Sequence, residues 1–410
     1  NINLLIPGGQ FGTRLQGGSD SASERYIFTQ LNPITLMLFP DADDKVLTYL
    51  DDDGTPVEPV WYAPVLPVVL INGSKGIGTG FSTDIPCFDP IAVSKYTHAK
   101  LKGEDTSDIK INLHYEGFKG VITKVEEQRY LIRGCYEVID SKTVRITELP
   151  IGTWTDDYKA FLEKLIDGDA KKKSIVKDYI DMSTDRLVDM TVTFAPGNVE
   201  KLRAVSLDYG CNGLEKLLKL YTTQTTTNMH MFDETEKLKK FKSPEEVIDS
   251  YIEVRRKVYV DRKKAQIKEL QLCASKLSNK ARFIIAVLDG KIDLRGKKNN
   301  EVSALLTKLK FDVIDEDDAY SYLVKMPMNS VTNENVLRLT SDRDIKLGEL
   351  EELQKTSETQ LWTRELDVFT SEYSEYVSER ARLDVDEKTK TKTKTKTKTK
   401  TVLKKQRVKK

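Results

Sequence analysis

The side chains best suited to chemistry lie close together near the start of the chain, in residues 7–29. The glycines of this stretch are Gly8, Gly9, Gly12, Gly17 and Gly18. Glycine lets the backbone turn tightly and come close to a ligand. Arg14 and Arg25 bracket a small polar run, and the planar arginine fork suits phosphate oxygens. Tyr26 follows directly, and its phenol is a candidate nucleophile. These residue types indicate phosphodiester chemistry, although they also occur as ordinary loop and core residues.

A second dense stretch covers residues 61–86. Residues 68–71 form a short apolar run that predicts a buried strand, and Asn72-Gly73 predicts a turn after it. Ile77 then stands between Gly76 and Gly78, in a spacing that does not fit a dinucleotide-binding fingerprint. Two interpretations remain open. Ile77 is either the inward-tucked tip of a hairpin or an apolar wedge that splits a base step.

The first stretch resembles the active-site region of eukaryotic-type and viral type IIA DNA topoisomerases. The resemblance is carried by Gln-Phe-Gly-Thr-Arg at residues 10–14, the following Gly-Gly, and Ala-Ser-Glu-Arg-Tyr-Ile-Phe-Thr at residues 22–29. It implies that Tyr26 attacks DNA and forms a 5′-phosphotyrosyl link while Arg25 holds the scissile phosphate. Glu24 departs from the family pattern, which has a small residue or proline there.

Residues 61–86 resemble the same family, in which the isoleucine at the place of Ile77 intercalates and bends DNA. Phe81 stands where the family has a tryptophan. The full set of expected DNA-binding residues is Gln10, Gly12, Arg14, Lys75 and Ile77. No metal ligand is expected in this chain. The acidic run at residues 51–53 could suggest a metal site, but a solvated turn fits better because no calcium-loop spacing follows.

Net charge is +1 over 410 residues, but it is unevenly distributed. The twelve basic residues from Lys388 onward leave 53 basic against 64 acidic residues in the body, which is about −11. The four cysteines and three histidines show no metal-ligand spacing, which indicates a reducing compartment. The apolar run at residues 61–71 is too short to span a bilayer. The chain begins at Asn1 within an apolar run, so we expect a fragment.

Apolar periodicity predicts an α+β fold. The resemblance divides it into the end of a winged-helix domain at residues 1–60, a mixed α/β tower at 61–240, and an antiparallel coiled coil at 241–387 with a small α-helical gate globule at about 289–330. Strands are expected around residues 121–122, 130–132, 143–149 and 187–194, and helices at 91–103, 155–165 and 200–207, with Thr155 as an N-cap. Residues 171–173, three lysines, form either a solvated loop or a contact with DNA flanks.

A long helix is predicted from Pro244, with Ser243 as its N-cap and Asp289-Gly290 at its end. Its apolar side chains recur at alternating spacings of three and four, typical of a coiled-coil seam; they are Ile267, Leu270, Ala274, Leu277, Ala281, Ile284 and Leu288. The basic residues of 255–264 are expected on an exposed face. A second long helical region is expected at 333–383. Residues 388–410 should be a disordered basic tail, which resembles a nuclear-localisation or polyanion-binding patch.

The resemblance implies an ATP-dependent type II DNA topoisomerase, an isomerase acting on double-stranded DNA as a homodimer in the nucleus, or in a virus-infected cell. Mg²⁺ and ATP would be bound by parts of the enzyme outside this chain, because no P-loop and no paired acidic TOPRIM motif is present. This chain alone is therefore expected to bind and bend DNA without cleaving it. Two alternatives remain: a non-catalytic DNA-bending module, and a coiled-coil dimer scaffold that binds DNA through its tail.

Overall fold

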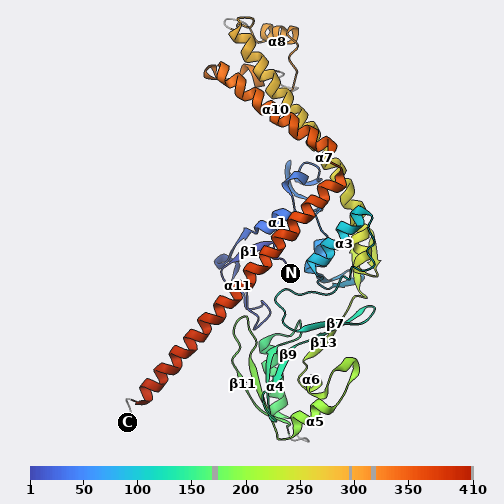
Figure 1. Cartoon of the computed structure of the whole chain (residues 1–410), viewed down its shortest axis with the longest axis vertical. Coiled ribbons are helices and arrows are strands. Elements are labelled where there is room, and N and C mark those ends of the chain that lie inside the picture. The colour runs from blue at the N-terminus through green and yellow to red at the C-terminus, as the bar shows by residue number, and fades with distance from the viewer. Residues whose placement is uncertain (169–173, 295–297, 315–319, 408–410) are drawn as a thin grey trace. The chain divides into compact units, whose positions relative to one another are not determined.

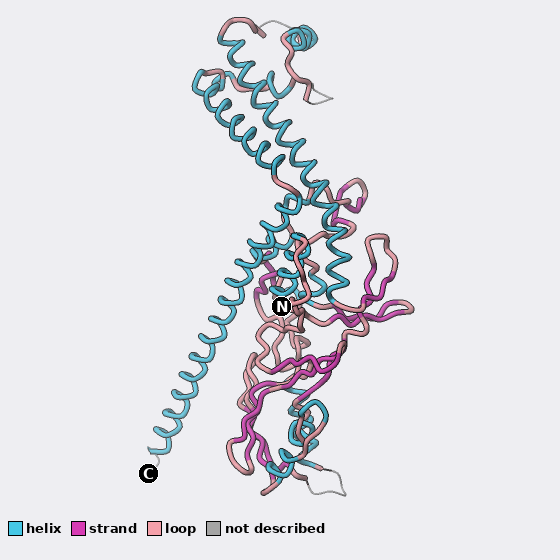
Figure 2. The backbone as a smooth tube through the Cα atoms, turned by 45° about the vertical axis from the view of Figure 1, so that its right-hand side comes forward, coloured by secondary structure: helices cyan, strands magenta, loops and turns pink. Residues whose placement is uncertain are grey.

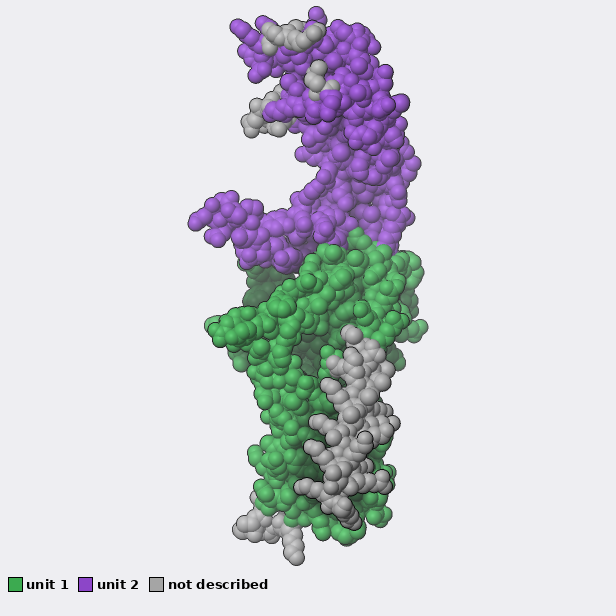
Figure 3. Space-filling view, turned by 90° about the vertical axis from the view of Figure 1, so that its left-hand side faces the viewer, with its two compact units in different colours: residues 1–39, 64–253, 365–410 green, residues 40–63, 254–364 purple. Residues whose placement is uncertain are grey.

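The computed structural model describes residues 1–168, 174–294, 298–314 and 320–407. The chain divides into two compact units, coloured separately in Figure 3. Unit 1 comprises Asn1–Phe39, Pro64–Glu253 and Glu365–Lys410, and unit 2 comprises Pro40–Ala63 and Val254–Arg364. The three lysines at residues 171–173 lie outside the described residues. The order of elements along the chain can be followed in Figure 1.

Unit 1 contains most of the strands, shown in magenta in Figure 2. One antiparallel sheet has the order β11-β12-β10-β9, and a second has the order β13-β8-β7. Three further pairs, β1-β2, β5-β6 and β14-β15, are separate two-stranded ladders. The strands are β1 (Leu5–Gly8), β2 (Phe28–Leu31), β5 (Ser74–Gly78), β6 (Phe81–Ile85), β7 (Val121–Glu126), β8 (Arg129–Arg133), β9 (Cys135–Val138), β10 (Thr143–Glu148), β11 (Val176–Asp181), β12 (Met190–Phe194), β13 (Tyr221–Thr225), β14 (Met229–Phe232) and β15 (Leu238–Phe241).

Unit 1 contains the first residues of the long helix α7 (Pro244–Leu288) and most of the long helix α11 (Glu358–Arg407), and its other helices are short. They are the 3-10 turns η1 (Glu24–Tyr26) and η3 (Asp208–Gly210), and the helices α1 (Pro33–Leu38), α2 (Val68–Asn72), α3 (Pro90–Lys102), α4 (Thr155–Asp167), α5 (Asn198–Ala204) and α6 (Gly213–Leu217). The strand expected at residues 68–71 is wrong, because this segment is helix α2, with Pro67 at its N-cap and with Leu70 and Ile71 buried. A short apolar run has no period that separates strand from helix.

One apolar core of unit 1 lies where helices α4 and α6 pack on the four-stranded sheet. Val144 and Ile146 of β10 are fully buried against Leu162 of α4 and Leu214 of α6. Tyr158 of α4 is also buried, donates its hydroxyl to the Leu218 carbonyl at 2.7 Å, and has its phenol pKa raised by burial. The expected alternation of buried and exposed residues in β10 is confirmed.

Unit 2 contains the short elements η2 (Asp41–Asp43), β3 (Tyr49–Asp52), β4 (Thr55–Pro59), α8 (Asn299–Lys308), α9 (Ser321–Val324) and η4 (Met328–Ser330), together with α10 (Asn333–Lys355) and parts of the long helices α7 (Pro244–Leu288) and α11 (Glu358–Arg407). The hairpin expected at Asp53-Gly54 is confirmed by β3 and β4. A small apolar core surrounds α8 and α9, with Leu306 and Leu323 fully buried.

Helices α7 and α10 pack along each other in unit 2. Ala281 and Ile284 of the expected seam are buried against Leu339 of α10, with Leu277 beside them. The predicted helix start is confirmed, since Ser243 Oγ accepts the backbone N–H of Glu246 at 3.3 Å. The second helical region is broken after Lys355, because Ser357 caps a new helix by accepting the N–H of Gln360 at 3.2 Å.

The exposed basic face expected at residues 255–264 is wrong for two arginines. Arg255 is fully buried and donates to Asp43 at 2.7 Å, and Arg262 is buried and reaches the same carboxylate at 3.5 Å. The Arg255 guanidinium also lies 4.2 Å from the centroid of Tyr259, which stacks on Trp362. Asp43 lies more than two hundred residues earlier in the chain, so the spacing of basic residues cannot reveal this pairing.

Helix α11 also differs from its expectation. The sequence predicts disorder from Lys388 onward, but α11 continues to Arg407. Residues 408–410 lie outside the described residues. Lysine is a good helix former, and extending an existing helix avoids the unfavourable nucleation step. The low apolar content of this segment means that it has few side chains to pack against other elements. It does not prevent the helix from continuing.

Candidate nucleic-acid interface

The glycine loop, residues 8–18, begins at the end of β1 and folds back on itself. Gly12 has φ +99° and Gly18 has φ +91°, which are left-handed conformations that favour glycine. A Cβ atom added to Gly12 would lie 2.4 Å from the Gly18 Cα, so the two backbone segments pass too closely for any side chain. The glycines therefore serve close contact within the protein.

Two hydrogen-bonded side chains close the glycine loop. Gln10 Oε1 accepts the backbone N–H groups of Gly12 and Ala22, each at 3.0 Å. Asp20 accepts the Thr13 hydroxyl at 2.6 Å and the Thr13 N–H at 2.9 Å. The Thr13 hydroxyl, followed by its N–H, lowers the pKa of Asp20 below its ordinary value of 3.8. Gln10 and Gly12, both expected to bind DNA, are placed by the structure in the framework of the loop.

Tyr26 and Arg25 lie on η1, a single 3-10 turn in which the Tyr26 N–H donates to the Ser23 carbonyl at 2.9 Å. Strand β2 follows at once and pairs with β1, so that Gly8 lies opposite Phe28. The Tyr26 side chain is 65% exposed, and the Arg25 guanidinium lies 5.0 Å from its ring centroid. A cation and a phenol are thus held together on the surface, where a phosphate could reach both.

Arg14 has a different environment from Arg25. Its guanidinium forms an ion pair with Glu148 at the end of β10, and its Nη1 reaches the second oxygen of Glu148 at 3.4 Å. The Glu148 side chain is 1% exposed and that of Arg14 is 24% exposed. The expected contact of Arg14 with DNA stays a prediction. In the structure its guanidinium is paired within the protein, because a buried carboxylate such as Glu148 requires a cation.

The β5-β6 hairpin carries Ile77 at the tip side of β5, opposite Ser82. The Ile77 side chain is 93% exposed, so the interpretation in which it tucks inward is wrong. The base of the hairpin is joined to neighbouring segments by the Asp84 N–H, which donates to the Asn228 carbonyl at 2.8 Å, and Lys75 lies 3.3 Å from Asp84.

Phe81 supports the same hairpin from β6. Its ring makes an edge-on contact with Phe232 of β14, with 5.6 Å between centroids. It also fills the space beside Gly78, where a Cβ atom would lie 2.6 Å from the ring. Phe81, at the position where the resemblance leads us to expect a tryptophan, thus has an aromatic partner.

Sequence reasoning missed the residues that hold these two segments in place. They are Asp20, Glu148, Trp154 and Phe232. Only Asp20 had a local signal, since it lies seven residues after its partner Thr13 within the same motif. The others come from distant strands and turns.

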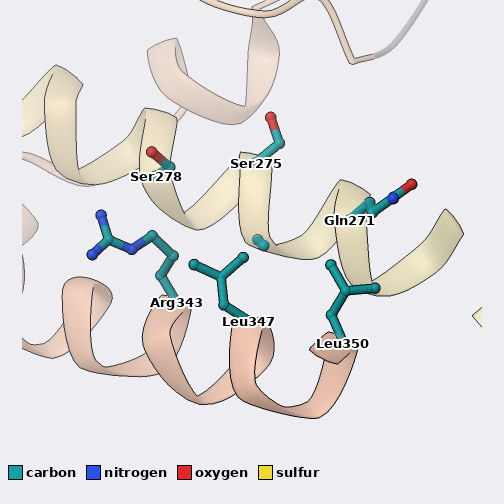
Figure 4. Close-up of a pocket in the computed structure, with 7 residues that line it drawn as sticks. Gln271, Ser275, Ser278, Arg343, Leu347 and Leu350 are labelled. Atoms are coloured by element: carbon teal, nitrogen blue, oxygen red, sulfur yellow. The ribbon is translucent and has the colours of Figure 1, made fainter. Parts of the chain in front are cut away.

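Other parts of the described chain show no comparable arrangement. No group of three or more His, Cys, Asp or Glu side chains is placed to hold a metal ion within residues 1–168, 174–294, 298–314 and 320–407. No helix among them is apolar for long enough to cross a membrane. A hollow between α7 and α10 is lined by Ser275, Ser278, Arg343, Leu347 and Leu350 (Figure 4). Its mixed lining has no nucleophile–base pair.

An exposed tyrosine lies beside an arginine, next to a loop that is held by its own hydrogen bonds. This arrangement suits a protein that binds the phosphodiester backbone of a nucleic acid. Comparison with known proteins agrees. Residues 1–367 match the family model that describes the A-type subunit of DNA gyrase and topoisomerase IV. The chain therefore belongs to this family.

Individual relatives are similar over nearly the whole chain. DNA topoisomerase 2 of Arabidopsis thaliana is 38% identical over 413 residues, covering 91% of this chain and 27% of the relative. DNA topoisomerase 2-alpha of Gallus gallus is 38% identical, with coverages of 91% and 25%. The DNA topoisomerase-like protein cin-4 of Caenorhabditis elegans is 35% identical, with coverages of 91% and 49%. The chain thus spans between a quarter and a half of the length of these relatives.

A solved structure of a topoisomerase II domain is also similar to this chain. The DNA-binding, cleavage and re-ligation domain of Plasmodium falciparum topoisomerase II superposes with a TM-score of 0.84 at 33% identity. The match covers 93% of this chain and 54% of that chain. The mixed α/β fold expected from the sequence is confirmed by this likeness.

Proposed function

We propose that this chain is the DNA cleavage and religation part of an ATP-dependent type II DNA topoisomerase. One observation carries the proposal: the Tyr26 phenol is exposed beside the Arg25 guanidinium, on a turn held by a hydrogen-bonded loop. The similar solved structure is named a DNA-binding, cleavage and re-ligation domain, which supports the same assignment.

The proposed reaction is a reversible transesterification. The Tyr26 oxygen attacks a backbone phosphorus, forms a bond to it, and releases its proton to solvent or a base. The bond from phosphorus to the 3′-oxygen breaks, the 3′-oxygen takes up a proton, and the DNA remains attached through a 5′-phosphotyrosyl link. Arg25 stabilises the negative charge that builds on the non-bridging oxygens. Religation is the reverse attack by the 3′-hydroxyl.

We infer that Ile77 is the wedge that bends the DNA, because its side chain is almost fully exposed on a paired hairpin. Lys75, whose side chain is 82% exposed, adds a cation on the same strand for the phosphate backbone. Gln10, Gly12 and Arg14 act indirectly, by shaping the loop that carries Tyr26.

The remaining requirements belong to a longer polypeptide. Mg²⁺ and ATP are assigned to parts of the enzyme outside this chain, since the described residues offer no cluster of metal ligands. The winged-helix remainder at residues 1–60 would be shared between the two units, and nearly all of the tower would lie in unit 1. The packed α7 and α10 with the small core around α8 would form a coiled coil and exit gate for a homodimer. Double-stranded DNA is the substrate and the nucleus the site of action.

The test is replacement of Tyr26 by phenylalanine in the complete enzyme. Covalent protein–DNA complex, trapped with denaturant after incubation with Mg²⁺ and supercoiled plasmid, should fall to background. DNA affinity should stay within about two-fold, because the exposed ring is kept. Tyr62→Phe is the control, since that tyrosine is also 57% exposed.

Two outcomes count against the proposal. Wild-type levels of covalent complex in Tyr26→Phe would remove Tyr26 as the nucleophile. Absence of any covalent complex in the unmodified complete enzyme would instead favour a non-catalytic DNA-bending module.

A further inference from the structure

We propose that Glu148 is a positioning residue that acts through Arg14 to set the location of Tyr26. The inference rests on the proposed function, because it assumes that Tyr26 reacts. It gives Arg14 and Glu148, which lie 134 residues apart, a shared role in the cleavage reaction.

Glu148 is equipped for this role by its burial and its partners. Its carboxylate accepts hydrogen bonds from both terminal nitrogens of Arg14. It also accepts hydrogen bonds from the backbone N–H of Lys119 at 3.2 Å and from the backbone N–H of Leu149 at 3.0 Å. A carboxylate with a 1% exposed side chain is stable only with such partners. Since its position is fixed by β10 and by two backbone groups, the carboxylate fixes Arg14 in turn.

Residues 14–17, which we call the strap, are attached to the same part of unit 1 at further points. The Arg14 N–H donates to the Asp185 carbonyl at 2.9 Å. Gln16 Nε2 donates to Asp156 at 3.2 Å. Gly17 lies against the indole of Trp154, where a Cβ atom would be 2.2 Å from the ring.

Helix α4 depends on the strap as well. Its N-cap residue is Trp154 rather than the predicted Thr155, and Trp154 offers no side-chain cap. The Leu15 carbonyl takes that place by accepting the Asp156 N–H at 3.0 Å. The strap therefore satisfies one of the donors that a helix start leaves unpaired, and helix and strap hold each other.

A short path leads from the strap to Tyr26. Thr13, next to Arg14, is bonded twice to Asp20, and Gln10 is bonded to Ala22. Ala22 is four residues before Tyr26. Because these hydrogen bonds connect residues 10–22, a displacement of the strap also displaces η1. In-line attack is sensitive to such shifts, since a misplacement of about 1 Å can reduce the rate about 100-fold.

The first experiment uses the complete enzyme with Arg14→Gln, Glu148→Gln and the double variant. Each single variant should reduce trapped covalent complex at least about ten-fold, with DNA affinity within about two-fold of the wild type. The double variant should be no worse than the worse single variant, because the two changes remove one shared interaction and leave a neutral pair. Arg14→Lys keeps the charge and loses the planar guanidinium, so it should show an intermediate loss of covalent complex. It also serves as a control in case the glutamine variants misfold.

Arg145→Gln is the matched control. Arg145 is also on β10 and also pairs through its fork, but its two bonds of 2.7 Å go to Asp189, which lies outside the strap. Cleavage should stay within about two-fold of the wild type. An equal loss in this control would reduce the effect to general damage of the sheet and would overturn the proposal.

A direct role of Arg14 on DNA gives a different pattern. Arg14→Gln would then weaken DNA binding and lower the salt-dependence slope by about one, and Glu148→Gln would not reproduce that change. This result would also overturn the proposal.

The second experiment reads the strap without any reaction. The chain holds three tryptophans, so ¹⁹F NMR of 5-fluorotryptophan protein gives few resonances, and Trp154→Phe assigns one of them. Arg14→Gln and Glu148→Gln should both shift the Trp154 resonance, and Arg145→Gln should leave it in place. An unmoved resonance in both test variants would show that the pair does not hold the strap.

The failures of the two proposals are distinguishable. Covalent complex that survives Tyr26→Phe refutes the proposed function, whereas the NMR shift can still be seen. Covalent complex that is abolished by Tyr26→Phe but unchanged by Glu148→Gln refutes only the positioning role.

Discussion

Two glycine-rich segments of unit 1, residues 8–18 and residues 73–80, have similar composition and differ in how they surround their central glycines. In the first, glycines lie where another part of the chain occupies the space of a side chain: Gly12 meets Gly18, and Gly17 meets Trp154. In the second, Gly73 and Gly78 are also packed, against the Ile85 carbonyl and the Phe81 ring, but Gly76, next to Ile77, has open space around it and no left-handed φ. Glycine therefore serves packing in both segments, and at Gly76 it also leaves the neighbouring Ile77 uncovered.

The two segments hold the two proposed functional side chains, Tyr26 and Ile77, in different ways. Tyr26 is held by a loop that is bonded to itself and to distant strands, so its position is set by many contacts. Ile77 is held by strand pairing and by one aromatic contact behind the hairpin. A reactive group needs precise placement, whereas a wedge needs stiffness and an uncovered apolar side chain.

The largest expected effect separates the glycines themselves. Gly12→Ala should destabilise unit 1 by on the order of 2 kcal/mol or more, because it combines a strained φ with a 2.4 Å clash against backbone. Gly76→Ala should change stability by less than about 0.5 kcal/mol. Urea unfolding followed by tryptophan fluorescence measures both, and equal losses would contradict the comparison.

The next effect concerns bending by Ile77. Ile77→Ala should lower the DNA bend measured by fluorescence transfer between the ends of a labelled duplex. Holding a base step apart costs a few kcal/mol of unstacking, and the alanine side chain is too small to do so. Folding should be unaffected, because the side chain is 93% exposed. Ile180→Ala, at a 58% exposed position on β11, is the control and should leave the bend as it is.

A smaller effect is expected behind the hairpin. Phe232→Ala removes the edge-on contact with Phe81, worth about 1 kcal/mol. Amide hydrogen exchange in β5 and β6 should accelerate by roughly five-fold, while exchange in the β3-β4 hairpin stays the same. Unchanged protection of β5 and β6 would mean that strand pairing alone stiffens the hairpin.

The smallest effect is a titration in the glycine loop. Asp20 has a folded-state pKa below its ordinary value of 3.8, so its bonds to Thr13 stabilise the loop fully above that value and are lost as pH falls through the folded pKa. Thr13→Val removes the hydroxyl and should raise the pKa of Asp20 toward 3.8, as measured by carboxyl NMR. Asp105, whose pKa is lowered by Ser107, should titrate as before.

The sequence alone determined which residues could react and which segments are regular. Tyr26 with Arg25, the Ile77 hairpin, helix α7 from Pro244, and the strand pattern of β10 follow from local spacing and resemblance. These features depend on contacts between near neighbours in the chain, such as turns, caps and alternation, and the sequence displays such neighbours directly.

Tertiary structure decided the partners and the burial of the charged residues. Arg14 and Arg25 look equivalent in the sequence, yet Arg14 pairs with a buried Glu148 and Arg25 lies against an exposed Tyr26. Arg255 likewise looks like part of a basic surface and is buried against Asp43. The free energy of a charge depends on its burial and on its counter-charge. For Arg14 and Arg255, both are set by segments more than a hundred residues away, and no local pattern specifies them.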